Sequence, residues 1–280
     1  MWIQLDLHAH PDEYEFLIAL LTDFETCGIQ EDTEAGGTHL SAFFPADRPI
    51  AEFRKSFSTA MVQRKLASGF RLSKIRIDPG QWLQEARRRF RGFSIGQTFY
   101  IHPGWVEPPP YSPVCIRMEP GRAFGTGTHE STRLALRNLE KAASGSRTVL
   151  DIGTGSGILA MAAVKLNPAA QVTAIDIDGQ ATRCAASNFL KNQVFHIHLV
   201  QAGVEAMASR WDLVVANLTG PILGKLSAEI DRITGGDLIV SGFACEASST
   251  VLESFSEYGF QRHRELVDRG WSSLHLRRFK

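Results

Sequence analysis

The sequence predicts an α/β protein in which a doubly wound, mostly parallel sheet follows a smaller α/β domain. From about residue 113 onward, short runs rich in β-branched residues alternate with helical stretches, which is typical of a parallel sheet covered on both faces. Segment 101–120 contains six prolines, so it is stiff and non-helical and marks a boundary before that sheet. The predicted strands are TVLDI (148–152), VTAIDI (172–177), DLVVAN (212–217) and DLIVSGF (237–243), with LHLRRFK as a candidate edge strand at the end of the chain.

The first 78 residues predict a small unit of alternating strands and helices, similar to a ferredoxin-like module. WIQLDLHA alternates between apolar and polar residues as a half-buried strand does. Asp12 is a candidate cap for a helix to about Cys27, and Gly28 is its expected stop. The apolar face of that helix is predicted to be Phe16, Leu17, Leu20 and Leu21. THLSAFFP (38–45), Ile50 to Ala67 and GFRLSKIRI (69–77) predict a strand, a helix and a strand.

A basic helix is expected to link the two parts. Asp78-Pro79-Gly80 is a helix start with proline in the first turn, and Arg87, Arg88, Arg89 and Arg91 follow. A basic helix can contact RNA, but one short run is more often a solvated face, so direct RNA contact is not favoured. We therefore predict a recognition domain at 1–78, a linker at 79–112 and a catalytic domain at 113–280.

The composition is that of a soluble globular protein. Among 280 residues, 44% are hydrophobic and 21% are charged. The start, MWIQLDLHAH, lacks the basic and apolar regions of a signal peptide. No run approaches the roughly 20 apolar residues of a membrane span. We expect a cytoplasmic protein with no membrane partner.

Charge is spread unevenly along the chain although the formal net charge is zero. Residues 1–52 hold eleven acids against Arg48, a formal charge of −10, and residues 53–100 hold eleven bases against Asp78 and Glu85, a charge of +9. The two segments can neutralise each other within one domain. Alternatively, the acidic segment receives a basic partner.

The strongest local signal is TVLDIGTGSGILAMAAVKL (148–166), a buried strand followed by a glycine turn and an apolar helix. Gly153, Gly155 and Gly157 allow a tight turn and a close approach of the backbone to a ligand. The spacing differs from the G-x-G-x-x-G of dinucleotide-binding proteins, and Asp151 stands on its strand side. An acid has no good role beside a pyrophosphate but suits an ammonium group, such as that of S-adenosylmethionine.

Polar residues follow the next two predicted strands. Asp176 is placed to bind both ribose hydroxyls of a nucleoside, whereas Asp178, two residues on, is more simply a helix cap. Asn217 could accept a hydrogen bond from an amine and orient its lone pair. This resembles the asparagine of many N-methyltransferases, although the two prolines and the aromatic residue of their motif are absent; an ordinary turn residue is the alternative.

The segment EPGRAFGTGTHESTRLAL (119–136) predicts a lid over the cofactor. Gly125 and Gly127, with the hydroxyls of Thr126, Thr128 and Thr132, make a small, polar loop that leads into a helix. The apolar residues before it, Ala123 and Phe124, indicate that the loop packs over a ligand. A plain surface loop is the alternative. His129 is a possible polar contact and a weak candidate for a general base.

These segments together resemble the ribosomal protein L11 methyltransferase family over nearly the whole chain. The segment 119–136 resembles its most specific motif, and LDIGTGSGILAMAA, AIDID, VVANL, VSG and EYGF occur in its order. The sequence departs from the family in having HEST where many members have His-Pro-Thr-Thr, in one added residue before AIDID, and in a weakly matching N-terminal part.

The resemblance implies that the protein transfers methyl groups from S-adenosylmethionine to lysine ε-amines and the N-terminal α-amine of ribosomal protein L11. It also implies cofactor contacts at Thr132, Gly153, Asp176 and Asn217. Because its amide could orient an amine, Asn217 is also the candidate catalytic residue. The reaction would be direct displacement at the sulfonium methyl, without an identifiable general base or metal. Three alternatives stay open: a methyltransferase with another protein target, a nicotinamide oxidoreductase, and a non-catalytic ribosome-assembly factor.

Overall fold

The computed structural model divides the chain into two compact units, Met1–Arg89 and Phe90–Lys280. Within the described residues, no helix is both long and apolar enough to span a membrane. The structure describes residues 2–24, 26, 28–34, 37–45, 49–75, 91–111, 114–118 and 127–278. The predicted linker helix from Pro79 lies almost wholly outside these residues.

The N-terminal unit is a four-stranded antiparallel sheet with two helices. Its elements are β1 (Trp2–Ala9), α1 (Tyr14–Asp23), β2 (Gly28–Glu34), β3 (Gly37–Pro45), α2 (Ile50–Gln63) and β4 (Phe70–Ile75), with a 3₁₀ turn at Pro11–Glu13. The strand order is β2-β3-β1-β4, and all three pairs are antiparallel. This order with this sequence of elements confirms the ferredoxin-like prediction.

Alternation along the strands gives this sheet one covered face and one open face. In β1, Ile3, Leu5 and Leu7 are buried and join a core built with side chains of both helices. The residues between them, such as Asp6 and His8, point to the opposite face because successive side chains of a strand alternate. That opposite face carries polar side chains from all four strands.

The local predictions for this unit were wrong in four details. The first helix ends at Asp23, and Gly28 begins the edge strand β2 instead of stopping a helix. Phe16 is 58% exposed, so it does not belong to the buried face of α1. The strand GIQEDTE was missed because it has a single apolar residue, Ile29, and an edge strand needs no apolar alternation. The second helix also ends earlier than expected, at Gln63.

A three-stranded sheet begins the second unit. It consists of β5 (Phe93–Ile95), β6 (Phe99–His102) and β7 (Val114–Arg117), in the order β5-β6-β7. β6 and β7 are parallel, and the proline-rich segment runs between them. Ile101 and Ile116 are buried in the core of the second unit. Residues assigned to the linker therefore form part of this core.

A seven-stranded sheet forms the centre of the second unit. Its strands are β8 (Thr148–Ile152), β9 (Gln171–Asp176), β10 (Ile197–Gln201), β11 (Trp211–Asn217), β12 (Thr234–Ala244), β13 (Phe260–Asp268) and β14 (Trp271–Arg278). The order is β10-β9-β8-β11-β12-β14-β13. The first five strands in this order are parallel, and β14 is antiparallel to both of its neighbours. The predicted doubly wound sheet is confirmed.

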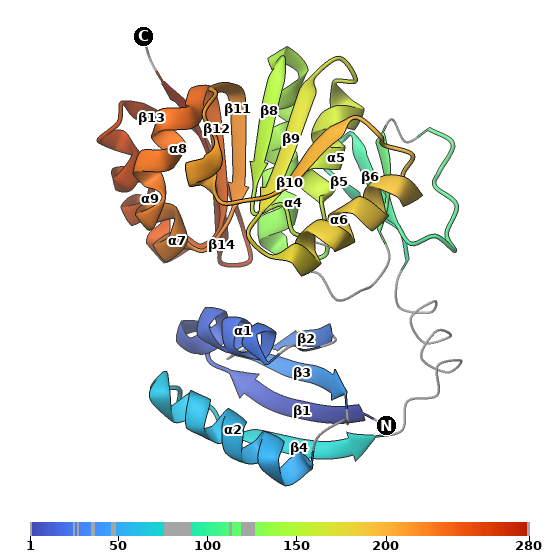
Figure 1. Ribbon diagram of the computed structural model, residues 1–280, viewed down its shortest axis with the longest axis vertical. Helices are drawn as coiled ribbons and strands as arrows, with labels where there is room; N and C mark the ends of the chain where they lie inside the picture. The colour runs from blue at the N-terminus through green and yellow to red at the C-terminus, as the bar shows by residue number, and fades with distance from the viewer. Residues whose placement is uncertain are drawn as a thin grey trace. The chain divides into compact units, whose positions relative to one another are not determined.

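Helices cover both faces of this sheet, as Figure 1 shows for α7, α8 and α9 on one side. The first face packs on α4 (Glu130–Ala142), α5 (Ile158–Leu166) and α6 (Gly179–Lys191), and the second on α7 (Gly220–Lys225), α8 (Ser227–Ile233) and α9 (Ser248–Ser256). Neighbouring residues of β11 alternate between the two cores: Leu213 and Val215 join the first, Val214 and Ala216 the second. Short 3₁₀ turns lie at Ala143–Gly145, Val204–Ala206 and Cys245–Ala247.

The prediction of a terminal edge strand was wrong. β14 lies inside the sheet between β12 and β13, and its Leu274 and Leu276 are fully buried. The edges are β13 and β10, two strands that the sequence analysis missed. Both carry mostly exposed or half-buried residues, so hydrophobic periodicity does not distinguish them from surface segments.

Candidate functional site

The predicted site residues gather at the carboxyl ends of neighbouring parallel strands. Asp151 of β8 is paired with Ala174 on β9 and Val215 on β11. Asp176 and Asn217 lie two residues beyond those partners, at the ends of their strands. Ligands of open α/β sheets bind at this edge, outside the carboxyl ends of the strands.

The glycine turn adopts a backbone conformation that favours glycine at three positions. Gly153, Gly155 and Gly157 have φ values of 68°, 54° and 82°. A Cβ on Gly153 would lie 2.6 Å from Leu218 Cδ2, and one on Gly157 would collide with the ring of Phe189. A side chain at Gly153 or Gly157 would therefore force a neighbouring side chain to move, so glycine is favoured at both positions by space as well as by backbone conformation.

Asp151 is buried inside this turn and holds it together. One carboxylate oxygen, Oδ2, accepts hydrogen bonds from Thr154 Oγ1 at 2.6 Å and from the Ala160 backbone N–H at 3.1 Å. The other oxygen, Oδ1, is buried without a hydrogen-bond partner among the described residues. Complete burial raises the pKa of this carboxyl to about 7, against the two hydrogen bonds, and the charge of Asp176 adds to the increase. A cationic group beside Oδ1 would relieve that burial cost.

Asp176 is half-buried and links the turn to the next loop. Its Oδ2 accepts from the Gly155 N–H at 2.9 Å, and its Oδ1 accepts from the Asp178 N–H at 3.0 Å. Each oxygen keeps a second lone pair, so the carboxylate can still accept from a diol. Asp178 caps α6 through Gln180 N–H at 2.7 Å, which confirms the helix-cap interpretation.

The amide of Asn217 is fixed from one side and free on the other. Its Nδ2 donates to Thr132 Oγ1 at 3.2 Å, across 85 positions of sequence. Its Oδ1 is buried and has no partner among the described residues. Thr132 is fully buried in the first turn of α4. The pair thus presents an oriented amide oxygen as an acceptor at the strand ends.

Gly242 of β12 is a site residue that the sequence analysis missed. Its φ is +96°, and a Cβ there would lie 2.9 Å from Asn217 Oδ1 and 2.6 Å from Leu218 O. The register of β12 against β14 shifts at this residue, which marks a bulge. A glycine inside the predicted strand DLIVSGF was the available signal, because such glycines mark close backbone approaches.

The segment before α4 is described only from Gly127 onward, so the predicted contacts of Phe124, Gly125 and Thr126 lie outside the described residues. Gly127 is buried with φ +86° and packs near Ile158. His129 caps α4 by accepting from the Ser131 N–H, and its ring packs edge-on against Trp271. Burial lowers the pKa of His129. Its place as a helix cap leaves no reason to assign it as a base.

This arrangement fits S-adenosylmethionine. The glycine turn provides an approach for the cofactor, and two buried acceptors, Asp151 Oδ1 and Asn217 Oδ1, have no partner among the described residues. Unpaired buried acceptors carry a substantial cost, so polar donors from a bound group are the natural complement. Asp176 supplies a further carboxylate for hydroxyl donors. The fold and the site define an S-adenosylmethionine-dependent methyltransferase.

Comparisons with known proteins give the family. A family model described as ribosomal protein L11 methyltransferase (PrmA) matches residues 1–279, so the chain belongs to this family. A ribosomal protein L11 methyltransferase of Shewanella frigidimarina is 34% identical over 279 residues, with 92% of each chain covered. One of Pelobacter propionicus is 38% identical over 212 residues, covering 72% of this chain and 68% of the relative.

A solved structure agrees with this assignment. The ribosomal protein L11 methylase of Lactobacillus delbrueckii subsp. bulgaricus superposes with a TM-score of 0.63 at 30% identity. The match covers 68% of this chain and all of that one.

Proposed function

We propose that this enzyme transfers methyl groups from S-adenosylmethionine to lysine ε-amines and the N-terminal α-amine of ribosomal protein L11. The names of the relatives support the substrate. The single structural observation that supports amine methylation is the buried, partnerless Oδ1 of Asn217 beside the glycine turn. When bound, S-adenosylmethionine supplies an electrophilic methyl group. Because ribosomal proteins are synthesised in the cytoplasm, the proposed substrate also places the enzyme there.

The cofactor contacts are proposed as follows. Asp176 accepts from the ribose hydroxyls and Asp151 Oδ1 from the ammonium group. The buried threonine of α4 fixes Asn217 and lies against the cofactor. The remaining backbone contacts are assigned to the glycine turn and the loop before α4, namely Gly153, Gly155, Gly157, Phe124, Gly125, Thr126 and Gly127.

Asn217 is proposed as the catalytic residue because an amide oxygen can accept an N–H of the incoming amine. That hydrogen bond turns the nitrogen lone pair toward the methyl group, and such positioning can lower a barrier by several kcal/mol. The bond from Thr132 keeps the amide oxygen aimed at the site. Gly242 leaves room beside that oxygen.

The substrate amine must be unprotonated when it attacks the methyl group. A free lysine amine has a pKa of about 10.4 and is nearly all protonated at pH 7. Half-buried Leu218, which covers Gly153, makes the approach partly apolar and thereby favours the neutral amine. We propose that the proton leaves to water before attack, because no side chain of the described site is placed as a base.

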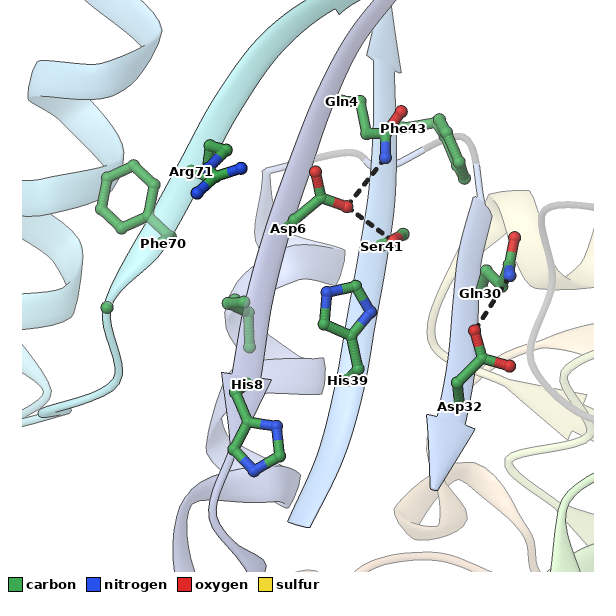
Figure 2. A pocket seen from close by; sticks show the side chains of 12 residues that line it. Gln4, Asp6, His8, Gln30, Asp32, His39, Ser41, Phe43, Phe70 and Arg71 are labelled. Atoms are coloured by element: carbon green, nitrogen blue, oxygen red, sulfur yellow. Dashed lines mark hydrogen bonds between the residues drawn. The ribbon is translucent and has the colours of Figure 1, made fainter. Parts of the chain in front are cut away.

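The open face of the N-terminal sheet is proposed as the surface that recognises the substrate. A hollow of about 930 Å³ lies on this face. Figure 2 shows the side chains that line it, which come from all four strands. At its centre Asp6 Oδ1 accepts from Gln4 Nε2 at 2.8 Å and from Ser41 Oγ at 2.6 Å. These bonds fix the carboxylate, and Oδ2 has no partner among the described residues. A fixed acid suits a lysine or arginine of a basic partner.

Mass spectrometry of recombinant ribosomal protein L11 tests the proposal. After incubation with enzyme and S-adenosylmethionine, we expect mass gains in steps of one methyl group, and no gain with Asp176→Ala. Cofactor binding is measured in parallel by calorimetry. Intact binding with no mass gain would reject ribosomal protein L11 as the substrate while keeping a methyltransferase of another target.

A further inference from the structure

A basic groove lies at the edge of the large sheet opposite to the cofactor site. It is lined where β8, β11 and β12 begin and where α4 ends, with a volume of about 540 Å³. The cofactor site occupies the carboxyl ends of the same strands. The two sites are therefore separated by the length of the parallel strands, and one can be filled without blocking the other.

β12 bulges at the groove, near the start of the strand. The register of β12 against β11 shifts between Trp211 and Leu213, opposite Gly235 and Gly236. A Cβ on Gly236 would lie 2.7 Å from Asp212 O, and one on Gly235 3.2 Å from Trp211 O. A side chain at Gly236 would thus collide with the backbone of β11, so glycine is favoured where the two strands approach closely at the groove.

Four cations line the groove against two acids, and both acids are engaged within the protein. Asp212 accepts from the backbone N–H groups of Arg147 and Thr148 and lies 3.6 Å from the Arg147 guanidinium. Asp237 accepts from Arg277 Nε at 2.6 Å and is bonded to the buried ring of His275. Both carboxylates therefore already accept hydrogen bonds from the protein itself. With four cations and two acids, the lining carries a formal charge of +2.

The cations of the groove are only partly engaged within the protein: Arg210 Nε donates to the backbone carbonyl of Arg232 at 3.1 Å, and the Arg147 guanidinium shares Asp212 with two backbone N–H groups. Among the described residues, Lys141 and Arg210 have no carboxylate partner, and the Arg147 side chain is 91% exposed. Lys141 stands in the last turn of α4, where it also stabilises the helix dipole. Arg147 and Arg210 lie in loops, so they have no such role at the end of a helix.

An aromatic side chain lies among these cations. Trp211 is half-buried: it packs against the core under α7, α8 and α9 and also lines the groove. A positively charged groove lined by a partly accessible aromatic residue is a combination that binds single-stranded nucleic acid, because cations follow the phosphates and a ring can stack on a base.

We infer that this groove binds single-stranded RNA, with Lys141, Arg147 and Arg210 contacting phosphates and Trp211 stacking on a base. The inference does not rest on the proposed substrate, since the groove is remote from the cofactor edge. An enzyme that binds RNA here can keep its catalytic edge available to a protein substrate.

The test is fluorescence anisotropy of the full-length enzyme with a labelled oligouridylate of about 12 nucleotides, a length that suits a single groove. With about three phosphate contacts, we expect micromolar binding at low salt and a slope of log K against log salt of about −2. In the double variant Lys141→Gln/Arg147→Gln, affinity is expected to fall about tenfold, and the slope to fall to about −1. Both side chains are exposed, so folding is preserved, which thermal unfolding verifies.

The control variant, Lys55→Gln/Arg262→Gln, removes two exposed charges elsewhere. Unchanged binding in this control, together with weaker binding in the groove variant, supports the site. Equal effects in both variants, or no detectable binding by the unmodified enzyme, overturn it. A duplex of equal length tests whether Trp211 stacks on a base, because the bases of a duplex are already stacked on one another. Tighter binding of the single strand supports stacking on Trp211, and equal binding rejects it.

Discussion

The two large sheets of this protein present functional groups in different ways. The N-terminal sheet is antiparallel, is covered on one face only, and carries its polar residues on the open face. The catalytic sheet is mostly parallel and covered on both faces, so its polar residues are confined to the strand ends. The site proposed at the strand ends needs glycines with positive φ, and these leave a recognisable motif in the sequence. The surface proposed on the open face consists of ordinary polar residues that alternate with buried ones, so no motif marks it.

The strand ends should therefore be far more sensitive to single substitutions than the open face. Asn217→Ala removes the oriented acceptor, and we expect kcat/KM to fall by about 100-fold, or roughly 3 kcal/mol. Steady-state methylation of ribosomal protein L11 measures this.

The matched control is Asn138→Ala. Like Asn217, Asn138 has a buried Oδ1 that lacks a partner among the described residues, but Asn138 is fully buried and its Nδ2 donates to Ser273. Its loss should lower thermal stability and leave kcat/KM per folded molecule unchanged. Similar kinetic losses in both variants would mean that burial, and not the position of the amide, accounts for the effect.

The glycine turn should show a loss of stability of intermediate size. Gly157→Ala forces a side chain onto a residue with φ +82° and against the Phe189 ring. We expect unfolding to become easier by about 2 kcal/mol, measured by thermal denaturation. Gly145→Ala, where a Cβ meets nothing within 4 Å, should change stability by less than about 0.5 kcal/mol. Equal melting temperatures would contradict the backbone argument.

The same contrast explains what the sequence could predict. Strands β8, β9, β11 and β12 were predicted within a few residues at each end because they are buried runs that end in glycine or polar residues. The edge strands β2, β10 and β13 were missed because their exposed positions have no periodic signal. For the large sheet the sequence predicted a mostly parallel, doubly wound sheet but not the order of its strands. Which strands become neighbours depends on packing, and no local sequence pattern records that.

The candidate site was predictable as a set of residues but not as a set of contacts. Asp151, Asp176 and Asn217 each follow a buried strand, and parallel strands bring such residues to one edge. The bond between Thr132 and Asn217 joins segments 85 positions apart, so it could only be seen in the fold. Asp151 was expected as a ligand contact, and the structure adds that it also ties the turn to α5.

The buried acid should give cofactor binding a pH dependence. Because the pKa of Asp151 is raised to about 7 by burial, the free enzyme holds a neutral carboxyl below that pH. An ammonium group favours the ionised form, so affinity for S-adenosylmethionine should rise about tenfold from about pH 5.5 to about pH 7. Asp151→Asn keeps an acceptor for Thr154 and Ala160 but removes the titration. Calorimetry should show a flat profile for this variant, and a rise that persists in it would assign the titration elsewhere.

The open face should respond least to substitution. Asp6→Asn keeps an acceptor for Gln4 and Ser41 and removes one charge, so KM for the ribosomal protein should rise about two- to fivefold with kcat unchanged. The difference should shrink at high salt because exposed charges are screened. Asp23→Asn, on the helix side of the same unit, serves as the control and should have no effect on KM. A fall in kcat would place Asp6 in the chemistry instead.

The decisive measurement is a pair of binding titrations on two variants. S-adenosylmethionine and ribosomal protein L11 are each titrated into Asp176→Ala and Asp6→Asn enzyme by calorimetry, with thermal unfolding as a check on folding. If the two sites are separate, Asp176→Ala should no longer bind S-adenosylmethionine but should still bind ribosomal protein L11. Asp6→Asn should bind S-adenosylmethionine normally and bind ribosomal protein L11 more weakly. Loss of cofactor binding in Asp6→Asn, or full cofactor binding in Asp176→Ala, would contradict it.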